Sequence, residues 1–278
     1  MSNTRLSFKN EAVYALYEGD YTIDPAILQE IITLGKAATD DLLKILEDAS
    51  LNTRLYTEEY SEAGGGFAPR HALYLLRDIN GEPKVFDYLL KFTQEDEATL
   101  DKLLGETFFV DEFWYYVCHY GQGYLSELEA MLYEMHLEVK MAVSGGLAQM
   151  ANYYPVHQKT IEQIFAKLID YYLDDEQMEQ LREEEGIFDN SDYDDDVTFI
   201  SVVTCDVLDA NLAHLKRRID ELFEFDLIDT NVLEPELAIF QENKLVPDTI
   251  FELYEAMQTE EEEEMEEEEN KPKVKKMK

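Results

Sequence analysis

Apolar residues recur every three or four positions over most of this chain, the spacing that places them on one face of an α-helix. The densest run covers residues 108–173 and holds four amphipathic patterns in succession, separated by short breaks. The first pattern consists of Val110, Phe113, Trp114, Val117 and Cys118. We therefore expect a core of consecutive helices joined by tight turns.

Capping residues predict where several of these helices begin and end. Asp24 and Pro25 predict a helix start, because aspartate accepts from free N–H groups and proline suits the first helical position. Gly35 predicts the end of this helix and Thr39 the cap of a second, antiparallel one. Helix pairs are expected to begin near Asp24, Pro69, Val110, Leu137 and Val197.

Two stretches contain residues that are unusual within a helix. Residues 197–208 are rich in β-branched side chains and could form a strand on propensity alone. The apolar stripe from Leu208 to Leu222 continues in helical register, however, so we expect a helix. In the third pattern of the central run, Gly145 and Gly146 would allow a neighbouring helix to approach closely.

A single helix pair cannot bury its apolar faces, whereas stacked pairs can. The sequence therefore predicts an all-α fold, an α-α superhelix (solenoid) of about five stacked helix pairs. The predicted repeat domain covers residues 1–258, with a mobile loop at 52–68 and an acidic insertion at 174–196. Residues 259–278 are Glu- and Lys-rich and are expected to be disordered.

The chain resembles HEAT- and armadillo-like repeat proteins, and more narrowly an uncharacterised bacterial HEAT-like family of unknown function. The resemblance covers roughly residues 23–233 and is carried by His71–Leu76, Phe113–Trp114 and Ala142–Ala148 with its paired glycines. It implies a fold and no particular reaction. Some members of that family end in a Cys-rich zinc segment, a feature that does not carry over because no Cys follows Cys205.

The charge is strongly one-sided, with 62 acidic against 23 basic residues and a net charge of −39. The Glu/Lys tail accounts for only four of these charges, so the body itself is acidic. Such a body repels phosphate backbones and anionic membranes, which favours a basic protein partner over direct contact with nucleic acid or membrane. An acidic mimic of nucleic acid is an alternative that rests on charge alone. No apolar run of membrane-spanning length is present, and we expect a cytoplasmic protein.

The sequence offers little support for metal or cofactor chemistry. Cys118 and Cys205 lie in apolar helical runs and are expected to be buried free thiols. No two histidines have the i, i+4 spacing of a helical zinc site. Asp192, Asp194 and Asp196 alternate like calcium ligands, but the required Gly and Glu positions are not filled. We expect no metal and no cofactor.

One polar face is the best candidate for a binding site. Asp111, Tyr115 and His119 recur at i, i+4 and i+8, opposite the apolar stripe, and could line a groove for a peptide. Together with His71 they are the candidate binding residues. The main hypothesis is a non-catalytic protein-interaction scaffold that uses a concave solenoid face. The alternative is a small-ligand binder or lyase-type enzyme in which Asp111, His119 and His71 converge in a cleft, an analogy at the level of the fold.

Overall fold

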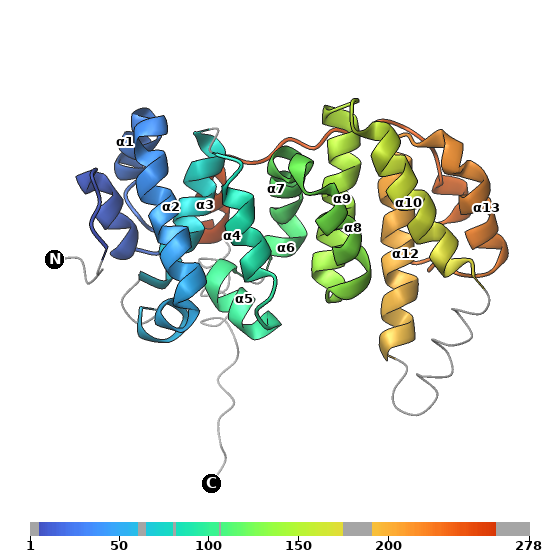
Figure 1. Cartoon of the computed structure of the whole chain (residues 1–278), viewed down its shortest axis with the longest axis horizontal. Helices are drawn as coiled ribbons and strands as arrows, with labels where there is room; N and C mark the ends of the chain where they lie inside the picture. Colours follow the sequence, from blue (N-terminus) through green and yellow to red (C-terminus); the bar gives the residue numbers. More distant parts are fainter. Residues whose placement is uncertain (1–5, 61–64, 80–81, 106, 175–190, 260–278) are drawn as a thin grey trace, which may run out of the picture. The chain divides into compact units, whose positions relative to one another are not determined.

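The computed structural model of the chain describes residues 6–60, 65–79, 82–105, 107–174 and 191–259 (Figure 1). Every regular element in these ranges is a helix, and their one isolated β-bridge joins Ala210 to Glu242. The prediction of an all-α protein is therefore confirmed. Within the same ranges, none of the helices combines the length and apolar character needed to cross a bilayer.

The chain divides into two compact units. The first unit combines Met1–Gly105 with Asp248–Lys278, and the second consists of Glu106–Pro247. In sequence, the second unit is thus an insertion into the first. The sequence suggested one continuous repeat domain over residues 1–258, and the contacts divide that stretch at 105/106 and 247/248.

The first unit opens with a 3-10 segment, η1 (Glu11–Tyr17), followed by the hairpin of α1 (Pro25–Leu34) and α2 (Lys36–Leu51). Asp24 caps α1 as predicted, because its carboxylate accepts from the Ala26 N–H at 2.8 Å. The predicted cap at Thr39 is wrong, since α2 begins directly after Gly35 and Thr39 is buried inside it. Gly35 adopts φ +54°, a conformation that favours glycine and lets one residue reverse the chain.

Three further helices complete this part of the first unit: α3 (Ala68–Asp78), α4 (Val85–Phe92) and α5 (Glu97–Leu104). Helix α2 packs against both α3 and α4. The stretch 52–68, expected to be a loop, contains the π-helical turn η2 (Leu55–Glu59) and the 3-10 turn η4 (Gly65–Phe67), whereas residues 61–64 lie outside the described ranges. Tyr56 is 1% exposed, so η2 contributes to the core.

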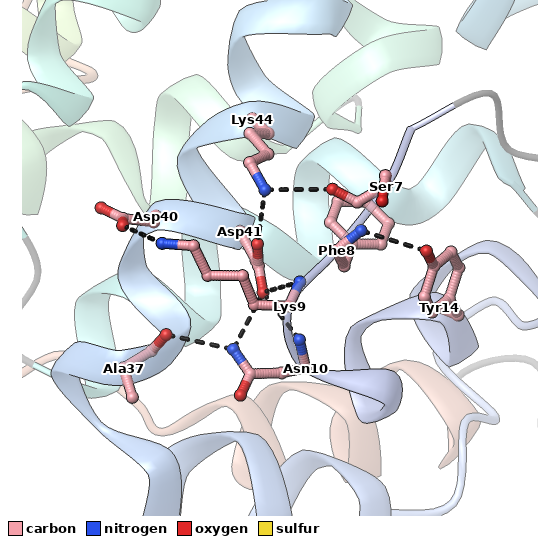
Figure 2. Close-up of polar contacts among 9 residues, drawn as sticks. All are labelled: Ser7, Phe8, Lys9, Asn10, Tyr14, Ala37, Asp40, Asp41 and Lys44. Atoms are coloured by element: carbon pink, nitrogen blue, oxygen red, sulfur yellow. Dashed lines mark hydrogen bonds and ion pairs between the residues drawn. The ribbon is translucent and has the colours of Figure 1, made fainter.

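A buried carboxylate anchors the segment before η1 to α2 (Figure 2). Oδ2 of Asp41 accepts from the backbone N–H groups of Lys9 and Asn10 at 2.9 and 3.0 Å and from Asn10 Nδ2 at 2.8 Å. Oδ1 accepts from Lys44 Nζ at 2.7 Å. The Asp41 side chain is 0% exposed, and each of its oxygens has a donor.

After the second unit, the chain returns to the first unit and forms helix 250–259. The carboxylate of Asp78 accepts from the Ile250 N–H at 3.0 Å and so caps the start of this helix. Near its other end, Gln258 Nε2 donates to the Tyr21 carbonyl at 2.8 Å. Ile250 and Tyr254 are buried, so the helix fills part of the core of the first unit.

The second unit starts with α6 (Phe108–Asp111) and α7 (Phe113–Tyr120), followed by the 3-10 turn η5 (Gly121–Gly123), α8 (Leu125–Glu134) and α9 (Leu137–Tyr153). The sequence predicted one helix through Val110 and Cys118. Instead, the helix is interrupted at Glu112 (φ −121°, ψ −31°), and Val110 is 59% exposed rather than part of the apolar stripe. The rest of that stripe is buried as predicted.

Helices α7 and α9 approach each other closely at Gly146. A Cβ at this position would lie 2.4 Å from Val117 Cβ and 3.0 Å from the Trp114 carbonyl oxygen. Only glycine permits this approach, which confirms the prediction that the paired glycines admit a neighbouring helix. Gly145 differs, since the nearest atom to its Cβ position, an oxygen of Asp206, is 3.7 Å away.

The second unit continues with α10 (Gln158–Tyr172), α12 (Ser191–Asp209), the 3-10 turn η6 (Ala213–Leu215), α13 (Lys216–Glu224) and the 3-10 turn η7 (Pro235–Leu237). Residues 197–208 are helical as predicted, despite their β-branched side chains. The hydroxyls of Ser201 and Thr204 donate to carbonyls one turn earlier, at 2.6 and 2.8 Å. Residues 175–190 of the predicted acidic insertion lie outside the described ranges, and its residues 191–196 begin α12.

Candidate functional site

In the second unit, α7 and the end of α9 bring a histidine and three tyrosines together. Tyr115 and His119 lie one turn apart on α7, with ring centroids 4.4 Å apart. The rings of Tyr153 and Tyr154, at the end of α9, lie 5.2 and 5.7 Å from the His119 ring. We call Tyr115, His119, Tyr153 and Tyr154 the His119 cluster. Tyr115 is buried, whereas the other three are partly exposed.

The polar contacts of the His119 cluster join neutral groups. His119 Nδ1 lies 2.7 Å from Tyr154 Oη. Burial lowers the pKa of His119 below its ordinary value and raises the pKa of Tyr154, so both side chains are uncharged at neutral pH. No described carboxylate hydrogen-bonds to His119, unlike the orienting group that general-base histidines use. The geometry suits recognition better than proton transfer.

Asp111 does not belong to this cluster, so the predicted face of three residues is wrong in part. Asp111 is the last residue of α6 and is exposed, while Tyr115 and His119 are on α7. The interruption at Glu112 breaks the i, i+4, i+8 register on which the prediction depended. Asp111 contributes through its backbone, because its carbonyl accepts from Trp114 Nε1 at 2.9 Å.

His71, the fourth candidate, belongs to the first unit and is fully buried. Its Nε2 lies 3.1 Å from the Gly19 carbonyl and therefore donates, which leaves Nδ1 to accept from the hydroxyl of Tyr254. Burial lowers the pKa of His71 to about 4, so the ring is neutral. Both nitrogens are used within the core, which makes His71 a structural residue that joins η1–α1 and α3 to helix 250–259.

An extended segment, residues 238–247, runs beside the His119 cluster. The side-chain amide of Gln149 donates to the Asn243 carbonyl at 2.9 Å and accepts from the Leu245 N–H at 3.0 Å. Asn152 also donates to the Asn243 carbonyl at 3.0 Å, and Tyr153 Oη donates to the Leu245 carbonyl at 2.5 Å. These bonds provide partners for backbone groups of a segment that lies outside regular secondary structure.

Exposed apolar side chains adjoin the cluster. Val156 follows Tyr154 by two residues and Val246 follows the Leu245 contact, and both are 82% exposed. Nζ of Lys244 lies 5.5 Å from the centre of the Tyr153 ring, within cation–π range. Aromatic rings, one cation and valines adjacent in sequence thus occur together in this region, and aromatic side chains are enriched in protein–protein interfaces.

The prediction of buried free thiols is confirmed for Cys118 and only in part for Cys205. Cys118 is buried and Cys205 partly buried, and neither forms a disulfide. Burial raises the pKa of Cys118 to about 12 and that of Cys205 to about 11, so both remain protonated and unreactive at neutral pH. In the part of the chain that the structure describes, no group of three metal-ligating side chains occurs.

The chain matches no protein-family profile, no curated protein and no solved structure. The resemblance to HEAT-like repeats therefore stays a prediction. Sequence reasoning missed Tyr153 and Tyr154, although a Tyr pair directly before Pro155 at a helix end was visible. It could not find residues 238–247 as a neighbour of His119, because Gln149 and Leu245 are 96 residues apart in sequence.

Proposed function

We propose that this chain is a non-catalytic, HEAT-like helical scaffold that binds a protein partner through the His119 cluster. The observation that carries the proposal is the cluster itself, in which partly exposed Tyr153, Tyr154 and His119 lie beside Val156 and Val246. Tyrosines contribute large contact areas at low entropic cost and are enriched at interface centres.

Two further observations support this function. Helix α9 contacts α7, α8, α10 and α12, and α10 in turn contacts α12 and α13, and these contacts between successive helices support a stacked arrangement. The net charge of −39 favours a basic partner and accelerates its association at low salt. An enzyme at this site would need polar groups that converge on His119, and the contacts of His119 are instead with tyrosine rings.

Site-specific photo-crosslinking tests the proposal. A photoreactive amino acid at position 156 should capture a partner protein in cells, and the purified partner should bind the chain with an affinity that falls as salt rises. The matched control places the same group at Phe225, which is 57% exposed and distant in sequence from the cluster. Tyr154→Ala should weaken binding by at least about tenfold, as expected for an aromatic interface centre. Equal capture at both positions, or unchanged binding by the Tyr154→Ala variant, would refute the proposed surface.

A further inference from the structure

Arg70 occupies an unusual position at the N-terminal end of α3 in the first unit. Its guanidinium carbon lies 4.8 Å from the centre of the Phe67 ring. On another side it meets Gly105, where a Cβ would lie 2.8 Å from Arg70 Cζ and Nη2. The guanidinium is thus held between an aromatic ring and a backbone that carries no side chain.

Among the residues that the structure describes, no carboxylate forms an ion pair with this cation. Among the described residues, nothing accepts a hydrogen bond from Arg70 Nε, which is shielded from solvent. By contrast, three other arginines form ion pairs with acidic side chains. The distances from Nε to the carboxylate oxygen are 3.4 Å for Arg77, 2.9 Å for Arg217 and 2.6 Å for Arg218. Acidic residues outnumber basic ones by 62 to 23, so the lack of a partner does not reflect a shortage of carboxylates.

The surrounding electrostatics make the missing partner costly. The start of an α-helix carries partial positive charge, which disfavours a cation at this end. The first turn of α3 has no acidic residue, and the residue at its cap, Phe67, provides no side-chain acceptor. Burial also lowers the pKa of Arg70, because the charged form loses hydration. A bound anion would relieve all three effects at once.

We propose that Arg70, at the N-terminal end of α3, binds an oxyanion group, a carboxylate or a phosphate, of a small ligand. Arg70 as a whole stays partly exposed, so an ion can reach it from solvent. Guanidinium groups form paired hydrogen bonds with both types of oxyanion, and a water-poor setting strengthens such bonds. This site is independent of the His119 cluster, since all its residues belong to the first unit.

Nuclear magnetic resonance on the full ¹⁵N-labelled chain tests the proposal directly. The Arg70 Nε–H signal, assigned by its loss in Arg70→Gln, is followed while sodium phosphate or sodium acetate replaces sodium chloride at constant ionic strength. We expect a saturable shift with at least one of the two anions and none with chloride. Phosphate alone would identify a phosphate group as the ligand chemistry, acetate alone a carboxylate, and both together an oxyanion in general.

Thermal unfolding in the same salts provides a second readout. Ligand binding to the folded state raises the melting temperature, because it stabilises that state by RT ln(1 + c/Kd) at ligand concentration c, which grows with the logarithm of ligand concentration once this exceeds Kd. Arg70→Gln should weaken this effect at least about tenfold, whereas Arg54→Gln, which removes an exposed arginine of the same unit, should leave it intact. Gly105→Ala keeps the charge but forces the guanidinium aside, and should also weaken binding.

Two results would overturn the site. One is the absence of a saturable Arg70 shift with either anion in the wild-type chain, a measurement that needs no variant to fold. The other is an Arg70→Gln variant whose anion-dependent stabilisation equals that of the wild type, which would show that the effect is a general one of salt on folding.

Discussion

Replacing Asp41 by Asn should detach the segment before η1 and destabilise the first unit. The carboxylate accepts four hydrogen bonds at 2.7–3.0 Å, two of them from the backbone N–H groups of Lys9 and Asn10. An amide can keep its single oxygen at the position of Oδ2, but it loses the negative charge that strengthens these bonds and turns an N–H₂ group toward the Lys44 ammonium. Hydrogen bonds to charged groups contribute about 1.5–3 kcal/mol each but are not additive. Because Lys44 can turn to water, we expect a loss of about 2–4 kcal/mol.

The exposed neighbour of Asp41 provides the control. Asp40 pairs with Lys9 Nζ at 2.8 Å, but both side chains are more than two-thirds exposed, so Asp40→Asn should have a far smaller effect. Urea unfolding followed by far-ultraviolet circular dichroism compares the two variants. Hydrogen exchange of residues 7–17 should accelerate in Asp41→Asn only. Equal stability of the two variants, or unchanged exchange at Lys9 and Asn10, would refute the reasoning.

The same carboxylate predicts a pH dependence. Burial alone would raise the pKa of Asp41, but hydrogen bonds from Lys44, Lys9 and Asn10 outweigh it and hold the pKa below its ordinary value. A lowered folded-state pKa means that the stabilisation is complete above the unfolded-state pKa and is lost as pH falls through the folded-state pKa. In Asp41→Asn, this part of the acid destabilisation should disappear.

Three further predictions concern other contacts. Gly146→Ala should cost about 1–3 kcal/mol through overpacking against Val117, while Gly145→Ala should be neutral or stabilising; fluorescence of Trp114, the only Trp, reports both. The pKa of His71 is about 4 in the folded state and about 6.5 in the unfolded state, so the free energy of unfolding should fall by about 3 kcal/mol as pH drops from 6.5 to 4. In His71→Gln, the urea midpoint should depend less steeply on pH. Gln149→Glu should release residues 238–247, because it replaces the amide that donates to the Asn243 carbonyl by a carboxylate, which repels that carbonyl. A lysine-specific protease should then cleave faster after Lys244.

Local signals predicted much of the helical structure. Asp24, Pro25 and Gly35 marked the ends of α1, because capping chemistry acts within a few residues. The close approach at Gly146 was also predictable, since a glycine pair inside a helix calls for a packing reason. The interruption at Glu112 was not, because no Pro or Gly marks it and Glu112 is buried by its tertiary surroundings.

The sites depend on contacts that no local pattern encodes. Asp41 looks like an ordinary helical aspartate, and only its contacts with residues 31 and 32 positions earlier make it an anchor. The His119 cluster was half predicted, since Tyr115 and His119 share one helix, whereas Tyr153 and Tyr154 arrive with α9. His71 was predicted to be a binding residue, but it is buried and contacts Tyr254, which lies 183 residues away in sequence.

The division of the first unit along the chain has a consequence for biosynthesis. Ribosomes deliver residues from the N-terminus onward, so residues 1–105 emerge long before helix 250–259 supplies Tyr254 and Ile250. Until then, His71 lacks its contact with Tyr254, and the Asp78 carboxylate lacks its bond to the Ile250 N–H. The inserted unit, by contrast, is contiguous and has all its residues once Pro247 has emerged. We therefore expect the second unit to fold before the first. The incomplete first unit should depend on chaperones until helix 250–259 has been synthesised.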